Sequence, residues 1–428
     1  MPARRVVVVG AGVVGVTTAH ALLADGYEVH LLDTAATAAS ATSHANGGFL
    51  SAAFCAPWAT PSLPKQVASS LLDFQAPFRW RPDGSIAQMR WLLQVLRNCK
   101  AATFGEHRQR MVRLALYSRN CMQKVISNTG VAFDLREAGV LLVYRNALPE
   151  HGIAQRLNEL QGFGIQASWC DEEQLRNLEP ELQRTTQLGG AIYVPDDASG
   201  DCERFVQGLL SWNVARGLNY QPNTRVEGLE LDASGKTLLA VRSGERHWKA
   251  DAFVFATGVE SARLLKPYMS IPVSPVKGYS VTFRAGTSSG GPKHAIIDEA
   301  SKLAVTRLGD RIRLAGMAEV VGFDSQINHA RCTQLVQQYQ ALYRDLPNID
   351  RSDWSGLRPM TPDGTPIVGS TSIDRLYLNT GHGTFGWTMA CGSAQLLADI
   401  VANRPTALDT NAYALNPLKR NPALNLSV

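Results

Sequence analysis

Three glycines near the N-terminus have the spacing of a turn that holds phosphate groups. They are Gly10, Gly12 and Gly15, in the segment VVVVGAGVVG. The first permits a tight turn, the second lets the backbone approach a pyrophosphate, and the third lets a helix pack close to a strand. A helix that begins here offers free N–H groups and a partial positive charge. The pattern predicts dinucleotide binding, with contacts from Val9, Gly10, Ala11, Gly12, Val13, Val14 and Gly15.

The residues around this turn have the order that such a site needs. Residues 5–9 are a β-branched run typical of a buried parallel strand, and the helical stretch after them ends at Gly26. The segment YEVHLLD is then a second strand that ends in Asp33, with Thr34 beside it. An acid at this place accepts hydrogen bonds from the adenosine ribose and disfavours a 2′-phosphate, which argues against NADP. Asp33 and Thr34 are therefore expected cofactor contacts; the alternative is a strand–helix–strand unit without a ligand.

A second glycine pattern lies near the C-terminus, in NTGHGTFGWT. A strand precedes it and a helix follows, but the chain after Arg404 is a Pro- and Asn-rich tail with no further strand. The segment is therefore either a backbone cradle at a helix N-terminus or a glycine-rich connection needed for packing. A cradle would hold the far end of one extended dinucleotide, and FAD is the cofactor whose flavin needs it. The expected contacts are Gly381, His382, Gly383, Thr384, Gly386, Trp387 and Thr388.

Two more stretches suit an FAD site. SATSHANGGFLS follows the Asp33 strand, and its small residues suit a backbone that wraps phosphates and a ribityl chain. VFATG ends an apolar strand in a turn, a place where a sheet edge meets a dinucleotide. The expected contacts therefore also include Ser43, Ala45, Asn46, Gly47, Gly48, Val226, Thr257 and Gly258.

The composition narrows the class of protein. The chain has 428 residues, of which 45% are hydrophobic and 18% charged, as in a globular enzyme of two or three domains. The net charge of +5 is spread without a dense basic run, which argues against nucleic-acid binding. No apolar run is long enough to span a membrane.

The cysteines and the acidic residues do not suggest a metal site. The seven cysteines show neither C-x-x-C nor zinc spacing, so we expect free thiols in a reducing cytoplasm. Asp196, Asp197 and Asp201 lie close together in sequence. We expect them to form a turn and to cap a helix that begins near Cys202, rather than to bind a metal.

Helical and strand-rich segments alternate along the chain. Residues 56–130 read as helical hairpins, and the segments 223–258 and 272–323 read as groups of short strands. These strands interrupt an α/β framework, so we expect domains that are interleaved in sequence. We predict a cofactor-binding domain from residues 1–56, 190–268 and 350–428, and a substrate-binding domain with a helical insert from 57–189 and 269–349.

Several long segments resemble one family of flavoproteins. They are VVGAGVVGVTTA, ATSHANGG, APWATP, MRWLLQVLRNC, PVKGYS, WSGLRPMTPDGTPIVG and NTGHGTFGWTMACG. With them the whole chain resembles the small subunit of bacterial FAD-dependent D-amino acid dehydrogenase, in the superfamily of D-amino acid oxidase, glycine oxidase and sarcosine oxidase. The resemblance implies a D-amino acid oxidase-like α/β fold, in which a Rossmann-type FAD-binding domain is interleaved with an antiparallel-sheet substrate domain.

The resemblance also implies an activity. This is oxidative deamination of D-amino acids to 2-oxo acids and ammonia by hydride transfer to the flavin, with electrons passed to a membrane quinone or another acceptor than oxygen. The Arg of the G-L-R-P motif is Arg358, which would hold the substrate carboxylate beside the cofactor through two parallel hydrogen bonds. The alternative for Arg358 is a structural ion pair. Phe49 stands where the family often has Gln, and Ser301 where it often has Tyr, so the preferred substrate side chain stays open.

Three further side chains are candidates for the catalytic site. Lys277 and Tyr279 share one face of a strand, and His382 lies inside the second glycine pattern. The alternatives are an ordinary strand position for the first two and a backbone-only role for His382. No His–carboxylate pair occurs at the motif positions, so we expect no dedicated side-chain base. No cysteine lies in a context that demands a bond to flavin, so we expect noncovalent FAD.

The segment from Trp80 to Arg97 mixes Arg, Trp and Leu, which suits a membrane surface as well as an ordinary exposed helix. Together with a quinone acceptor, it leads us to expect a cytoplasmic protein attached peripherally to the inner face of the bacterial inner membrane. Two other functions stay open. One is a related flavoprotein oxidase of glycine, proline-like or N-methyl amino acids, and the other is a non-catalytic flavin-binding subunit.

Overall fold

Strand β1 (Arg5–Val9) lies inside a six-stranded sheet of order β19–β20–β13–β1–β2–β9. The computed structural model describes residues 4–70, 76–183, 186–285, 291–343 and 349–415. All strands of this sheet pair in parallel except β19, so the carboxyl ends of β2, β1, β13 and β20 meet at one edge. The bounds are β2 (Glu28–Leu32), β9 (Asn219–Gln221), β13 (Ala252–Phe255), β19 (Ile367–Ser370) and β20 (Leu376–Thr380).

The β-branched run of β1 is buried on both faces. Val6 and Val8 pack into a core with the helices α1 (Val13–Ala24), α4 (Ala101–Thr129), α7 (Cys202–Val214) and α10 (Gly386–Val401). Val7 and Val9 pack on the opposite face against a small antiparallel sheet of β10 (Gly228–Leu231), β11 (Leu238–Ser243) and β12 (Arg246–Lys249). Alternation of side chains along the strand explains why every position of the run is apolar.

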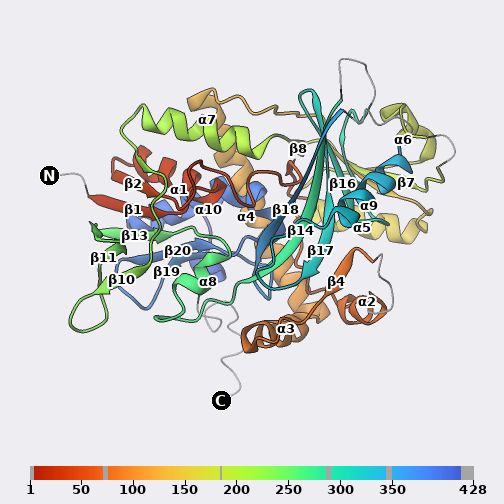
Figure 1. Ribbon diagram of the computed structural model, residues 1–428. Coiled ribbons are helices and arrows are strands. Elements are labelled where there is room, and N and C mark those ends of the chain that lie inside the picture. The colour runs from red at the N-terminus through yellow and green to blue at the C-terminus, as the bar shows by residue number, and fades with distance from the viewer. Residues whose placement is uncertain (1–3, 71–75, 184–185, 286–290, 344–348, 416–428) are drawn as a thin grey trace.

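A second sheet has nine strands in the order β18–β14–β17–β16–β15–β5–β7–β6, with β4 also paired to β17. Figure 1 shows it beside the first sheet, with α2 (Leu63–Ser70) and α3 (Ile86–Asn98) next to β4. The strands are β4 (Phe78–Trp80), β5 (Val140–Tyr144), β6 (Ser168–Cys170), β7 (Gly190–Val194), β14 (Ser274–Arg284), β15 (Ala295–Asp298), β16 (Leu303–Leu308), β17 (Arg311–Val320) and β18 (Ile349–Met360).

The two faces of this large sheet have different neighbours. Tyr279 and Val281 of β14 pack against α9 (His329–Gln340). Positions that alternate with these two, such as Gly278 and Thr282, point to the other face of the sheet, which is turned toward the first sheet. The remaining elements are short connections or flank the β6 end of the large sheet. They are β3 (Phe49–Leu50), β8 (Ala198–Ser199), α5 (Glu150–Gly162), α6 (Glu172–Leu178), α8 (Glu260–Leu264), η1 (Gly383–Phe385) and η2 (Thr410–Tyr413).

The predicted α/β class is confirmed, and the strand pairing differs from two of the proposed domain limits by one strand each. The ranges that begin at 190 and 350 assign β7 and β18 to the cofactor domain, whereas β7 pairs with β5 and β18 pairs with β14 in the large sheet. Both strands fit either sheet by local sequence, and only long-range pairing decides between them. The rest of the predicted division into domains stays a proposal.

Candidate functional site

The first glycine turn has the geometry that its spacing predicts. Gly10 has φ +103°, and a Cβ there would lie 2.7 Å from the backbone oxygen of Ala256. A Cβ on Gly15 would lie 1.7 Å from the oxygen of Gly10, so only glycine lets α1 pack onto the turn. Gly12 is the N-cap of α1 and, as a glycine, supplies no capping side chain of its own. The N-terminus of α1 therefore has the free polarity that suits a phosphate group.

Asp33 lies next to this turn at the carboxyl end of β2. Its carboxylate accepts hydrogen bonds from the backbone N–H of Ala11 at 2.5 Å and of Ala35 at 2.7 Å. The side chain is only partly buried, and Thr34 beside it is exposed. An acid held here, at the edge where the parallel strands end, fits the ribose of a dinucleotide.

The loop of residues 43–48 passes over the start of α1. The Ser43 hydroxyl accepts a hydrogen bond from the N–H of Val13 at 3.0 Å, and a Cβ on Gly12 would lie 3.3 Å from the same oxygen. The Asn46 side chain accepts from the N–H of Gly48, which has φ +75°. This side-chain bond and the left-handed glycine fold the loop into a compact turn beside the glycines. Ala45, within the same loop, is buried.

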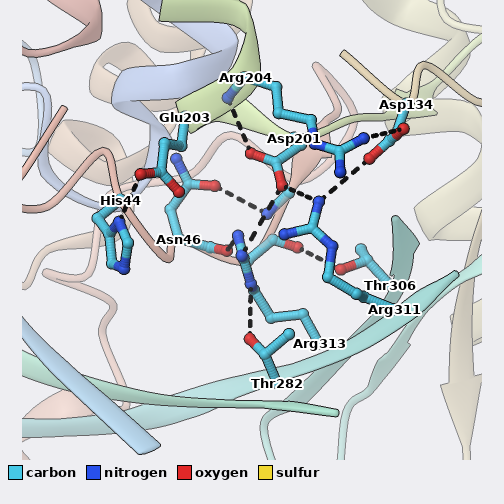
Figure 2. Close-up of polar contacts among 12 residues, drawn as sticks. His44, Asn46, Asp134, Asp201, Glu203, Arg204, Thr282, Thr306, Arg311 and Arg313 are labelled. Atoms are coloured by element: carbon cyan, nitrogen blue, oxygen red, sulfur yellow. Dashed lines mark hydrogen bonds and ion pairs between the residues drawn. The ribbon is translucent and has the colours of Figure 1, made fainter. Parts of the chain in front are cut away.

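Arginines from the large sheet anchor this loop, and the sequence alone did not reveal them. Figure 2 shows Arg313 of β17 donating to the backbone oxygen of Asn46 at 3.3 Å and to the Thr282 hydroxyl at 3.1 Å. The Thr306 hydroxyl donates to the oxygen of Gly47 at 3.1 Å. Charged residues at alternate positions of an otherwise apolar strand, as in RIRLAG, are the signal for such buried partners.

Two aspartates hold the arginines in place. Asp201 is fully buried and accepts from Arg311 at 2.7 Å, with Arg313 3.9 Å away. Asp134 accepts from Arg311 at 3.2 Å and from Arg204 at 2.8 Å, as Figure 2 shows. Asp201 also caps α7, which confirms the helix-capping prediction for this residue. The network joins the loop of residues 43–48, α7 and the large sheet.

The second glycine pattern is a turn at the start of η1 and α10. Gly381 has φ +76°, and a Cβ there would lie 2.7 Å from the Thr361 side chain. Gly383 has φ +56°, and a Cβ would lie 2.8 Å from the sulfur of Met360. No side chain caps the start of α10, so backbone N–H groups are available to an anionic group. Thr384 is exposed at this turn, and Gly383 and Gly386 are partly exposed.

Other residues predicted near this end lie around the turn or in the core. The Thr380 hydroxyl donates to the oxygen of Gly258 at 3.0 Å, which ties the ends of β20 and β13 together. The Thr257 hydroxyl pairs with that of Ser261 at 2.9 Å. The Trp387 ring packs against Phe133 and Phe205, the Thr388 hydroxyl bonds to the oxygen of Phe49 at 3.2 Å, and Val226 is buried beside the small sheet. The side chains of Trp387, Thr388 and Val226 therefore hold the framework.

His382 is placed as a backbone contributor. Its Nε2 lies 2.9 Å from the Ser393 hydroxyl of α10, inside the protein. Burial lowers the pKa of His382 to about 3, so the ring is neutral near physiological pH. The geometry thus disagrees with the prediction of a catalytic His382 side chain, because the ring faces α10 and does not gain a proton.

Arg358 is the most distinctive charged side chain of the site. Its Nη1 donates to the backbone oxygen of Met317 at 3.0 Å, and its guanidinium lies 5.9 Å from the Trp58 ring. A Cβ on Gly278 would lie 2.3 Å from the guanidinium carbon, so glycine makes room for it. Among the described residues no carboxylate forms an ion pair with Arg358, and burial lowers the pKa of Arg358 to about 10.

The structure does not bring Lys277 and Tyr279 to Arg358. The Lys277 ammonium lies 3.2 Å from Asp324, and the Tyr279 hydroxyl donates to Glu319 at 2.7 Å. Glu319 in turn accepts from Arg331 of α9 at 2.8 Å. Period-two alternation turns these side chains toward α9, whereas Arg358 lies over Gly278 on the other face. The prediction that they line the substrate pocket is therefore corrected to a supporting position behind the sheet.

The carboxyl edge of the first sheet thus carries two glycine turns, an acid and two helix starts whose N-cap residues make no side-chain hydrogen bond. This arrangement defines a protein that binds an extended dinucleotide along β2, β1, β13 and β20. The turns would clash with any side chain, and the free N–H groups match phosphates and an electron-rich ring.

A family model described as FAD dependent oxidoreductase (DAO) matches residues 5–400. The chain belongs to this family of FAD-dependent oxidoreductases, and FAD is its cofactor. The residues present fit FAD: Gly10–Gly15 and Asp33 would hold its adenosine end, and Gly381–Gly386 would hold its flavin end.

Solved structures share the fold. Glycine oxidase from Geobacillus kaustophilus is 22% identical over 96% of this chain and 99% of its own, with a TM-score of 0.73. L-Proline dehydrogenase from P. horikoshii is 17% identical over 98% and 99%, with a TM-score of 0.76. L-Amino acid deaminase from Proteus vulgaris is 16% identical over 97% of each chain, with a TM-score of 0.70. At these identities the likeness concerns the fold.

Proposed function

We propose that the protein catalyses FAD-dependent oxidative deamination of D-amino acids to 2-oxo acids and ammonia, with electrons passed to a quinone or another acceptor than oxygen. The observation that carries the proposal is Arg358, a partly buried guanidinium without a carboxylate partner among the described residues. Its strand neighbour Met360 touches the flavin-end turn at Gly383. A buried cation at this place needs an anion, and an amino-acid substrate supplies a carboxylate.

The role of Arg358 follows from its surroundings. Nη1 is engaged by the oxygen of Met317, which fixes the plane of the guanidinium. Among the described residues no other hydrogen bond engages its donors, so they can hold a carboxylate by two parallel hydrogen bonds, which orient the bound substrate as well as attract it. Desolvation makes this attraction stronger than it would be in water.

The described residues offer no evident base beside Arg358. The His382 ring is bonded to Ser393, and Tyr279 and Lys277 lie behind the sheet. The substrate amine must therefore be neutral before oxidation, having lost its proton to water. When bound, FAD supplies the oxidising chemistry by accepting a hydride from the substrate.

The preference for the D form and for an acceptor other than oxygen rests on the resemblance of WSGLRPMTPDGTPIVG and NTGHGTFGWTMACG to D-amino acid dehydrogenases. One position that departs from the family pattern lies apart from Arg358. Ser301 donates to Asp298 at 2.6 Å and borders an open surface hollow with Arg145. Ser301 therefore does not define the proposed carboxylate site.

A membrane surface is the proposed location, with α3 as the contact. Ile86, Met89, Leu93 and Leu96 are 71%, 46%, 51% and 50% exposed and recur at helical spacing on one face. The exposed Arg90 and Arg97 belong to the same helix, and no acidic residue occurs between residues 84 and 105. An exposed apolar stripe with basic neighbours fits an anionic lipid surface. No helix of the described ranges meets the length and hydropathy of a membrane span.

Anaerobic mixing of the FAD-loaded protein with D-amino acids tests the proposal. We expect the flavin absorbance to bleach with D-amino acids, to stay unchanged with the L forms, and to recover slowly in air and rapidly with a soluble quinone. Rapid recovery in air would identify an oxidase instead. Absence of bleaching with every amino acid would identify a non-catalytic flavin-binding subunit and overturn the proposed function.

A further inference from the structure

An apolar cavity lies between α3, β4 and the end of β18. Its volume is about 150 Å³. No described residue that lines it carries a charge, and its walls include the side chains of Trp58, Phe78, Trp80, Trp91, Leu92 and Met360. The one hydroxyl in the lining, that of Thr361, already donates to the oxygen of Thr365 at 2.9 Å. The cavity therefore suits an apolar group and offers little to a charged one.

Two residues join this cavity to the proposed carboxylate site. Trp58 lines the cavity, and its ring lies 5.9 Å from the Arg358 guanidinium. Met360 also lines the cavity and follows Arg358 by two positions on β18, so their side chains share a face. Trp58 and Met360 thus connect the cavity to the guanidinium, although Arg358 does not itself line the cavity.

Met360 joins the cavity to the flavin end as well. Its sulfur lies 2.8 Å from the position of a Cβ on Gly383, and its backbone bridges to His382. The Trp91 indole donates to the oxygen of Met360 at 2.9 Å, which fixes this part of β18 against α3. Carboxylate anchor, flavin-end turn and apolar cavity therefore meet around one residue.

We infer that this cavity binds the side chain of the substrate and that the preferred substrates are amino acids with aromatic or large aliphatic side chains. The inference rests on the proposed function, because it takes the carboxylate to be on Arg358 and the reacting carbon to be near the Gly381–Gly383 turn. The third substituent then points toward Met360 and Trp58. A cavity of about 150 Å³ accepts a group the size of benzene, and this one opens along α3, where its lining residues Met89, Leu93 and Leu96 are exposed.

The physical reason for selectivity is twofold. A phenyl or isobutyl group is transferred out of water and gains contacts with the cavity walls. A methyl group leaves most of the cavity unfilled. A carboxylate or ammonium side chain loses its hydration there and finds no charged partner among the described lining residues. We therefore expect kcat/KM for phenylalanine and leucine to exceed that for alanine by at least about tenfold, and that for glutamate to be lower still.

The test combines a substrate panel with variants that fill the cavity. Ala59 is 2% exposed in the cavity wall, and Leu92 is a partly buried wall residue of α3. Ala59→Phe and, as a milder change, Leu92→Trp should lower kcat/KM for phenylalanine by about tenfold or more and leave alanine within about twofold. Leu239→Phe, at an exposed site on β11, is the matched control and should change neither value.

Ligand binding provides a second readout that does not depend on turnover. Phenylacetate should bind the FAD-loaded protein more tightly than acetate in calorimetry, and Ala59→Phe should remove most of this difference. An equal effect of the filling variants on all substrates and both ligands, or a wild-type preference for alanine or glutamate, would overturn the inference. If no amino acid of either hand is oxidised while phenylacetate still outcompetes acetate, the proposed function fails but the apolar subsite stands.

Discussion

Arg358 donates from Nη1 to the backbone oxygen of Met317 at 3.0 Å, and Met317 has φ +60° in the middle of β17. The pairing of β14 with β17 shifts register at this point, so β17 bulges opposite Lys277 and Tyr279. A bulge redirects a carbonyl that regular pairing would use within the sheet. A positive φ at a non-glycine residue costs about 1–3 kcal/mol and is usually kept where function needs it. Here the bulge aims an acceptor at the guanidinium.

The pH dependence of carboxylate binding should report Arg358 alone. Burial lowers the pKa of Arg358 to about 10, so the cation persists below that pH and is lost above it. Burial also lowers the pKa of His382 to about 3, so His382 stays neutral throughout. The affinity for acetate should be constant from about pH 5 to 9 and weaken above about 10. Turnover should rise with pH as the substrate amine loses its proton.

The measurement is calorimetric titration of the FAD-loaded protein with acetate at several pH values. A change of affinity near pH 6 to 7 that disappears in His382→Gln would contradict the neutral assignment of His382.

FAD should be held without a covalent bond. Cys391 is the cysteine closest in sequence to the flavin-end turn, but it is 4% exposed inside α10, and burial raises its pKa. A neutral buried thiol is a poor nucleophile. Precipitation with acid should therefore release all of the yellow colour into the supernatant. A yellow pellet that becomes colourless in Cys391→Ser would reject this.

Replacing Asp197 should stabilise the protein at high pH relative to low pH. Burial raises the pKa of Asp197 from 3.8 to about 6, although the Ser51 hydroxyl and the Ala52 N–H donate to it. The neutral acid therefore contributes stability that is present below about pH 4 and is lost as the pH rises through about 6. Asp197→Asn stays neutral, so its free energy of unfolding relative to wild type should rise from pH 4.5 to 8 by about 2 kcal/mol.

Urea unfolding at both pH values measures this difference. Asp196→Asn, at the exposed neighbouring position, should show no comparable change. An Asp197→Asn difference that is the same at both pH values would show that Asp197 is ionised in the fold.

Binding to anionic vesicles should depend on the exposed stripe of α3. Ile86→Glu with Leu93→Glu removes two apolar contacts and adds negative charge, so vesicle binding should fall by more than about tenfold. Leu239→Glu alters an exposed leucine on β11 and should bind like wild type. High salt should weaken wild-type binding because it screens Arg90 and Arg97. Co-sedimentation measures each case, and equal binding of both variants would place the contact elsewhere.

The sequence predicts the parts of the site that depend on local geometry. Gly10, Gly15, Gly381 and Gly383 are needed by their own turns, so their spacing reveals them. The face of a sheet on which a side chain lies is not determined by local geometry. Alternation shows that Lys277 and Tyr279 share a face, but only the packing of α9 decides which face it is.

Long-range partners are likewise invisible in local patterns. Arg313 reaches the loop of residues 43–48 across the two sheets, and the Met317 bulge exists only because β14 and β17 pair out of register. The pairing of β7 with β5 and of β18 with β14 is likewise hidden, because the local sequence of a strand does not determine its partner. The apolar cavity brings Trp58, Trp91 and Met360 together from three separate segments.

The most direct test of the central claim is Arg358→Ala in the FAD-loaded protein. FAD content should stay nearly unchanged, because we expect the cofactor contacts in the glycine turns. The kcat/KM for a D-amino acid should fall by the equivalent of about 2–5 kcal/mol, or roughly 30- to several-thousand-fold, and the affinity for acetate should fall in parallel. Arg358→Lys should restore only part, because an ammonium lacks the planar fork. Normal affinity of Arg358→Ala for both substrate and acetate would contradict the account and place the carboxylate elsewhere.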